Sequence, residues 1–105
     1  MVAFVSSAGN IANLENIRTS NLDVVNKNGN YPGTQPVIVW LSYNVHGNET
    51  RSSEAAMEAL YELANPAKKR TQPWFKNTVV VIDPCLNPDG RERYINYYNS
   101  VIIII

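Results

Sequence analysis

Residues 37–49 read Val37-Ile38-Val39-Trp40-Leu41-Ser42-Tyr43-Asn44-Val45-His46-Gly47-Asn48-Glu49. The stretch from Pro36 to Tyr43 is almost continuously apolar, without alternation, which predicts a strand covered on both faces, as in a parallel sheet. A helix is predicted to begin near Glu49. The residues between them therefore lie at the carboxyl end of a strand, where ligands bind in open α/β sheets.

Strands and helices alternate on both sides of this stretch. Thr50–Ala64 is rich in alanine and leucine with glutamates at intervals of four, which favours a helix, and Asn65-Pro66 ends it. The other predicted elements are a strand at Val2–Val5, an amphipathic helix from Asn10 to Leu22, a loop at Asn26–Gln35 and a strand at Thr78–Ile82. The order predicts an α/β fold, a mainly parallel or mixed sheet flanked by helices.

Two features mark the second half of the chain. Asn87-Pro88-Asp89-Gly90 follows the last predicted strand and is typical of a turn. Val101–Ile105 is wholly aliphatic, which suits a buried strand but would leave an aggregation-prone edge at a free terminus. We therefore expect residues 1–105 to form one partial domain, truncated at both ends.

Composition excludes several classes of protein. The 105 residues are 45% hydrophobic and carry nine basic and nine acidic side chains, which indicates one small globular domain without a field to attract nucleic acid. We expect Lys68-Lys69-Arg70 to be a solvated loop. The chain shows no signal peptide and no apolar run of the roughly 18 residues that span a membrane. With one cysteine and one histidine, it cannot build a disulfide framework or a site from several imidazoles.

The one histidine, His46, stands three residues before Glu49. Gly47 lies between them and permits a sharp turn, so that both side chains can aim at one point. Imidazole nitrogen and carboxylate oxygen are good zinc ligands at roughly 2.0–2.2 Å, and we expect their ligand atoms to approach within about 4–5 Å. Glu49 could instead be an acidic residue that stabilises the first turn of a helix.

Two segments resemble the zinc metallocarboxypeptidases of peptidase family M14. Val39–Glu49, with the helix Ser53–Ala64 after it, is similar to the first zinc-binding segment of that family. Asp83–Glu92 resembles the family's Asn-Pro-Asp-Gly segment. The two occur in the right order, with a helix and a strand between them. The resemblance covers roughly Val2–Ser100 and implies a partial carboxypeptidase-like catalytic domain.

The resemblance implies that His46 and Glu49 are the first two ligands of Zn²⁺, and that the substrate is a peptide or protein. It implies a structural turn at Asn87–Gly90, without a catalytic role. The third ligand, a histidine, and the general base, a glutamate, are expected beyond this chain. Arg91 and Arg93 lie too close to the turn to match the family's substrate-binding arginines, so substrate-binding residues are unassigned.

Further expectations follow from the resemblance. Asn48 stands where the pancreatic-type branch has an arginine, so the substrate contacts of that branch do not transfer. The chain alone is expected to be inactive, and the family suggests a secreted or periplasmic protein. Cys85 is expected to be a small buried side chain rather than a nucleophile.

Two alternatives remain open. The first is a related zinc amidohydrolase that deacylates N-acyl amino acids and also uses a His-Gly-x-Glu segment. The second is a non-catalytic α/β module in which His46 and Glu49 are structural. The stretch Asn87–Glu92 favours the peptidase over the amidohydrolase.

Overall fold

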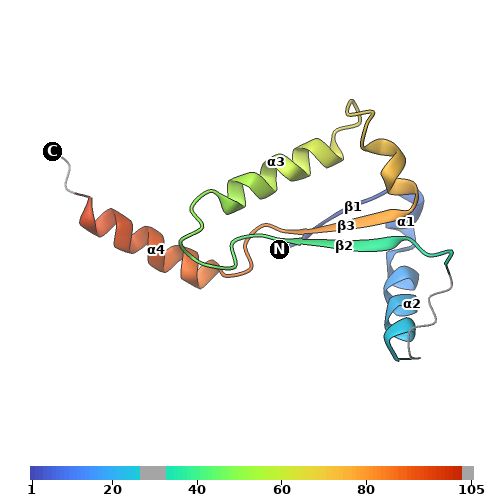
Figure 1. Ribbon diagram of the computed structural model, residues 1–105, viewed down its shortest axis with the longest axis horizontal. Coiled ribbons are helices and arrows are strands. Elements are labelled where there is room, and N and C mark those ends of the chain that lie inside the picture. The colour runs from blue at the N-terminus through green and yellow to red at the C-terminus, as the bar shows by residue number, and fades with distance from the viewer. Residues whose placement is uncertain (27–32, 103–105) are drawn as a thin grey trace.

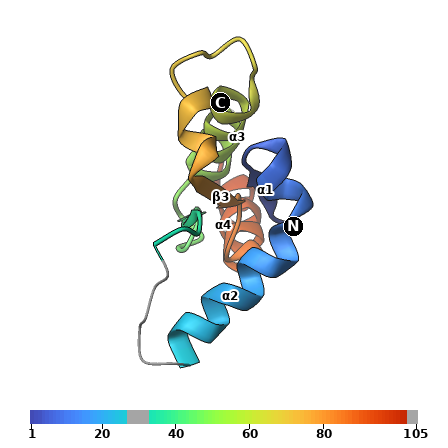
Figure 2. The ribbon, with the colours of Figure 1, turned by 90° about the vertical axis from the view of Figure 1, so that its right-hand side faces the viewer.

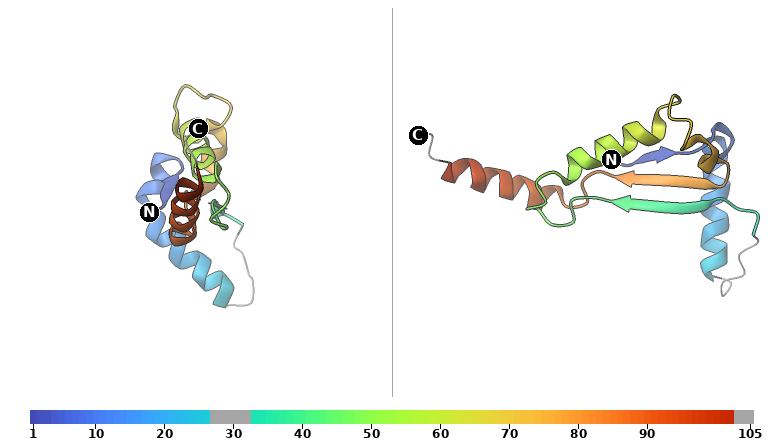
Figure 3. Two further views of the ribbon diagram at one scale, coloured as in Figure 1. Left: turned by 90° about the vertical axis from the view of Figure 1, so that its left-hand side faces the viewer. Right: turned by 45° about the horizontal axis from the view of Figure 1, so that its top comes forward.

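A computed structural model describes residues 1–26 and 33–102 of the chain (Figure 1). Its centre is a three-stranded sheet of order β1-β3-β2. The strand β1 (Ala3–Val5) pairs antiparallel with β3 (Thr78–Asp83), and β2 (Val37–Ser42) pairs parallel with β3. Figure 3 shows the three strands side by side. The predicted α/β class with a mixed sheet is confirmed.

The helices match the predicted order, with two additions. They are α1 (Ala8–Ala12), α2 (Leu14–Asn26), α3 (Ser52–Ala64), the 3₁₀ helix η1 (Gln72–Lys76) and α4 (Pro88–Val101). The single helix predicted from Asn10 to Leu22 is divided at Asn13, whose N–H donates to the Asn10 carbonyl and closes α1. No helix of the described ranges is long and apolar enough to cross a membrane. The loop predicted at Asn26–Gln35 lies mostly outside the described residues.

The core lies between the sheet and α3, which covers one face (Figures 1 and 2). Ala56 of α3 is fully buried, because its small side chain lets the helix approach the strands closely. The buried cluster consists of Val5, Ala56, Phe75, Val80 and Ile82. On the opposite face, Ile17 of α2 is buried close to Val79 and Val81. The strand β3 is therefore buried on both faces.

The strand β2 was expected to be covered on both faces, and in the described part of the chain this expectation is wrong. Val37 is 55% exposed to solvent and Trp40 is 63% exposed. The reason is that α3 packs over β1 and β3, whereas β2 lies at the edge of the sheet beyond this cover. Its apolar run correctly predicted a parallel strand but could not show that one edge lies open.

The turn predicted at Asn87–Gly90 is the beginning of a helix. Asn87 caps α4 through its side chain, Pro88 is the first helical residue and Asp89 lies in the first turn. Proline suits that position because its missing N–H has no helical partner there. The helix carries no buried residue and projects from the carboxyl end of the sheet (Figures 1 and 3). It ends at Val101, so the first residue of the aliphatic run Val101–Ile105 is helical, and residues 103–105 lie outside the described residues.

The core position of Ile82 yields a first prediction. Ile82→Ala should lower the free energy of unfolding by about 2–5 kcal/mol, because it leaves a cavity in the buried cluster. Ile38→Ala on β2 is the matched control and should cost about 1 kcal/mol or less, because Ile38 is already exposed. Urea denaturation of both variants measures the difference, and equal losses would contradict this account of the core.

Candidate metal centre

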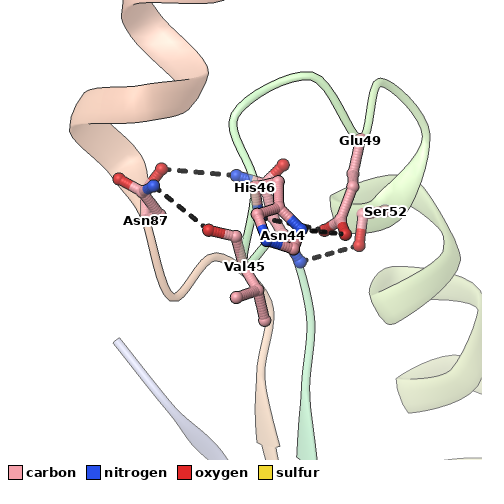
Figure 4. Close-up of polar contacts among 6 residues, drawn as sticks. All are labelled: Asn44, Val45, His46, Glu49, Ser52 and Asn87. Atoms are coloured by element: carbon pink, nitrogen blue, oxygen red, sulfur yellow. Dashed lines mark hydrogen bonds and ion pairs between the residues drawn. The ribbon is translucent and has the colours of Figure 1, made fainter.

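His46 and Glu49 lie in the turn between β2 and α3, beyond the carboxyl ends of the two parallel strands (Figure 4). The His46 Nδ1 atom is 3.1 Å from Oε1 of Glu49, so the predicted approach of the two side chains is observed. Their side chains are 76% and 41% exposed, which leaves both open to a ligand from solution.

Two hydrogen bonds between His46 and Glu49 hold the backbone of this turn. The Glu49 N–H donates to the His46 carbonyl at 3.1 Å, and the His46 N–H donates to Oε2 of Glu49 at 3.3 Å. The hydrogen bond from the His46 side chain, assisted by backbone N–H donors, lowers the pKa of the Glu49 carboxyl. Glu49 is therefore ionised at neutral pH, which is the form that binds a cation.

The donor pair fits part of a zinc shell. Two atoms that each lie about 2.0–2.2 Å from one tetrahedral ion are roughly 3.3–3.6 Å apart, close to the 3.1 Å between Nδ1 and Oε1. Within the residues that the structure describes, no group of three or more His, Cys, Asp or Glu side chains could hold a metal. Among the described residues, the pair could therefore supply at most two ligands, whereas a zinc site needs three or four protein groups.

Gly47 is required because the backbone of α4 passes close to it, a contact that the surrounding sequence did not predict. We expected a sharp turn at this glycine, but among the described residues the left-handed φ angles belong to Asn44 (54°) and Gly33 (67°). A Cβ atom at Gly47 would instead lie 2.1 Å from the Gly90 carbonyl oxygen and 2.9 Å from its Cα. Only glycine permits this close approach of the turn that carries His46 and Glu49 to α4.

Asn44 is a functional candidate that sequence reasoning missed. It is fully buried, and its backbone N–H donates to Ser52 Oγ at 2.7 Å, which ties the turn to the start of α3. Its Nδ2 lies 3.3 Å from Cys85 Sγ. Asparagine directly after a strand was the available signal, because it adopts the left-handed region more readily than other residues with a side chain.

The other residues singled out in the sequence lie in this turn or in the segment that follows β3. Cys85 is half-buried against Asn44, in keeping with a structural thiol. Arg91 pairs with Glu54 at 3.0 Å and lines a cavity of about 220 Å³ beside the turn. The cavity is lined by Gly47, Thr50, Arg91, Tyr94, Ile95 and Tyr98. Asn48 and Arg93 are exposed.

Comparison with known proteins identifies the family. A model of the peptidase M14 family, described as zinc carboxypeptidase, matches residues 14–100, a range that includes the ligand turn and the Asn87–Gly90 segment. The chain therefore belongs to the zinc carboxypeptidase family. Searches of curated proteins and of solved structures gave no match.

The close approach of Gly47 to Gly90 yields a second prediction. Gly47→Ala should lower the free energy of unfolding by about 1–3 kcal/mol, because the new methyl group meets backbone atoms that cannot rotate away. Gly9→Ala is the control. Nothing lies within 4 Å of a Cβ at Gly9, and alanine favours its helix, so this variant should be neutral or more stable. Urea denaturation compares them, and an undiminished stability of Gly47→Ala would refute the close contact.

Proposed function

We propose that this chain carries the first two zinc ligands of a metallocarboxypeptidase that hydrolyses peptide bonds at the C-termini of peptides or proteins. The observation that carries the proposal is the contact between His46 Nδ1 and Glu49 Oε1 at the carboxyl ends of parallel strands, inside the range matched by the zinc carboxypeptidase family. The alternative of a purely structural pair is disfavoured by its exposure, because an exposed ion pair contributes little to stability.

Each residue has a distinct task in this proposal. His46 supplies an imidazole nitrogen, and Glu49 supplies an ionised carboxylate. These two side chains would hold a zinc ion, which would supply Lewis-acid chemistry for the activation of water and of the scissile carbonyl. Because both side chains face solvent, a peptide could reach the pair without displacing part of the described structure.

The open edge of β2 supports the idea that the site is completed from outside the pair. Val37–Tyr43 contains no charged residue and ends three positions before His46. Natural sheets rarely leave such an apolar edge bare, because it pairs readily with another strand. A strand added there in parallel would end beside the turn and could bring the third ligand.

The ligand assignment yields a third prediction. His46→Ala and Glu49→Gln should each weaken Zn²⁺ binding by about tenfold or more. Each variant leaves one donor where there were two, so the advantage of binding one ion with two side chains is lost. Glu58→Gln is the control, an acidic residue on the exposed face of α3. Isothermal titration calorimetry measures the Zn²⁺ affinity of every variant. In the variants that keep His46, its ring signals report binding without ambiguity, because the chain has no other histidine. Unchanged affinity in either ligand variant would contradict the assignment.

A fourth prediction concerns activity. The 105-residue chain with equimolar zinc should not cleave a blocked dipeptide with a free C-terminus. Positioning, metal polarisation and proton transfer act together, and a site with two ligands lacks several of these parts. Turnover of the peptide that a chelator abolishes would show that a complete site forms, and turnover of an N-acyl amino acid instead would favour an amidohydrolase.

A further inference from the structure

Two asparagine side chains join the loop after β2 to the loop after β3. Asn87 Nδ2 donates to the Val45 carbonyl at 3.1 Å, and Asn44 Nδ2 donates to the Asn87 carbonyl at 3.4 Å (Figure 4). The backbone adds a bond from the Asn87 N–H to the Asn44 carbonyl at 3.2 Å. The Asn-Pro-Asp-Gly segment is thus bound directly to the residues that precede His46.

These contacts act on the peptide unit that carries His46. The Val45 carbonyl and the His46 N–H belong to one planar group. Asn87 holds the oxygen of that group, and Oε2 of Glu49 accepts from its N–H at 3.3 Å. On the other side of the residue, the Glu49 N–H donates to the His46 carbonyl at 3.1 Å. With the peptide groups before and after His46 both held, the direction of its Cα–Cβ bond is restricted.

Asn44 occupies an unfavourable conformation at the same place. Its φ of 54° is uncommon for a residue with a side chain, and its Oδ1 is buried without a hydrogen-bond partner among the described residues. Such conformations persist where the surrounding contacts enforce them, and they occur often at functional sites. Asn44 is held by Ser52, Cys85 and Asn87.

We propose that Asn44 and Asn87 are positioning residues that fix the backbone at His46 and thereby orient its imidazole toward Glu49. The proposal deepens the proposed function, on which it rests in treating His46 and Glu49 as zinc ligands. A fixed imidazole loses little freedom when it binds a cation. Partners of metal ligands typically change metal affinity by about 10–100-fold when they are replaced.

Asn87→Asp is the sharpest variant. Aspartate keeps the oxygen that accepts from the Gly90 N–H, so it caps α4 as well as asparagine does. It replaces the donor to the Val45 carbonyl with a carboxylate oxygen, which cannot donate, so this hydrogen bond is lost. Asn10→Asp is the matched control, since it also adds one negative charge and removes a side-chain amide donor to a backbone carbonyl, that of Phe75 at 2.9 Å. Asn10 lies near the start of β3, whereas His46 lies beyond its end.

The first measurement needs no metal. The order parameter of the His46 backbone amide, from ¹⁵N relaxation, should fall from about 0.85 to about 0.6 in Asn87→Asp, while that of Val80 in the core is unchanged. Asn10→Asp should leave the His46 value unchanged. Asn44→Gly keeps the left-handed backbone, removes the amide and should give the same loss at His46. Unchanged order at His46 in Asn87→Asp and Asn44→Gly would overturn the proposal.

The second measurement is a titration with Zn²⁺ alone. Asn87→Asp should weaken binding by about 10–100-fold although its added negative charge favours a cation, whereas Asn10→Asp should bind as the unmodified chain does. Equal affinity of Asn87→Asp and the unmodified chain would overturn the proposal. If the unmodified chain does not take up Zn²⁺, the ligand assignment fails, and the order parameters still decide whether the asparagines position His46.

Discussion

The parallel pairing of β2 with β3 is the constraint on which the rest of the structure depends. Its register places Ser42 opposite Asp83, so that both strands end at the same level of the sheet. The two following loops must therefore leave side by side. The Gly47–Gly90 approach and the asparagine hydrogen bonds, which shape the candidate site, join the chain after β2 to the chain after β3. A shift of one residue would turn each side chain to the opposite face and separate them.

Elements with a strong internal pattern could be predicted from the sequence. The β-branched runs in β2 and β3 and the alanine-rich repeat in α3 carry their own signal, and so does the three-residue spacing of His46 and Glu49. The helix α4 was missed because proline followed by aspartate and glycine suits both a turn and a helix start. The open edge of β2 was missed because exposure depends on neighbours that the strand's own residues do not specify.

The residues that support the site were harder to predict because their partners are distant in the sequence. Position 47 requires glycine because the Gly90 backbone lies close to it. The left-handed conformation of Asn44 is maintained by hydrogen bonds to Cys85 and Asn87. The core, by contrast, depends on apolar contacts between α3 and the sheet. Hydrogen bonds of backbone and asparagine groups thus shape the site, while apolar packing stabilises the fold.

The hydrogen bond between His46 and Glu49 competes with the proposed binding of a metal ion. Because Glu49 is ionised, its Oε1 accepts the hydrogen bond, and Nδ1 of His46 must donate it. Under the proposed zinc assignment, the same nitrogen would have to be free of that proton to bind the cation. The cation would therefore replace the mutual hydrogen bond of the pair. The bonds of the His46 N–H and the Val45 carbonyl involve neither Nδ1 nor Oε1. They would therefore be kept in such an exchange and would continue to hold the backbone from which the imidazole projects.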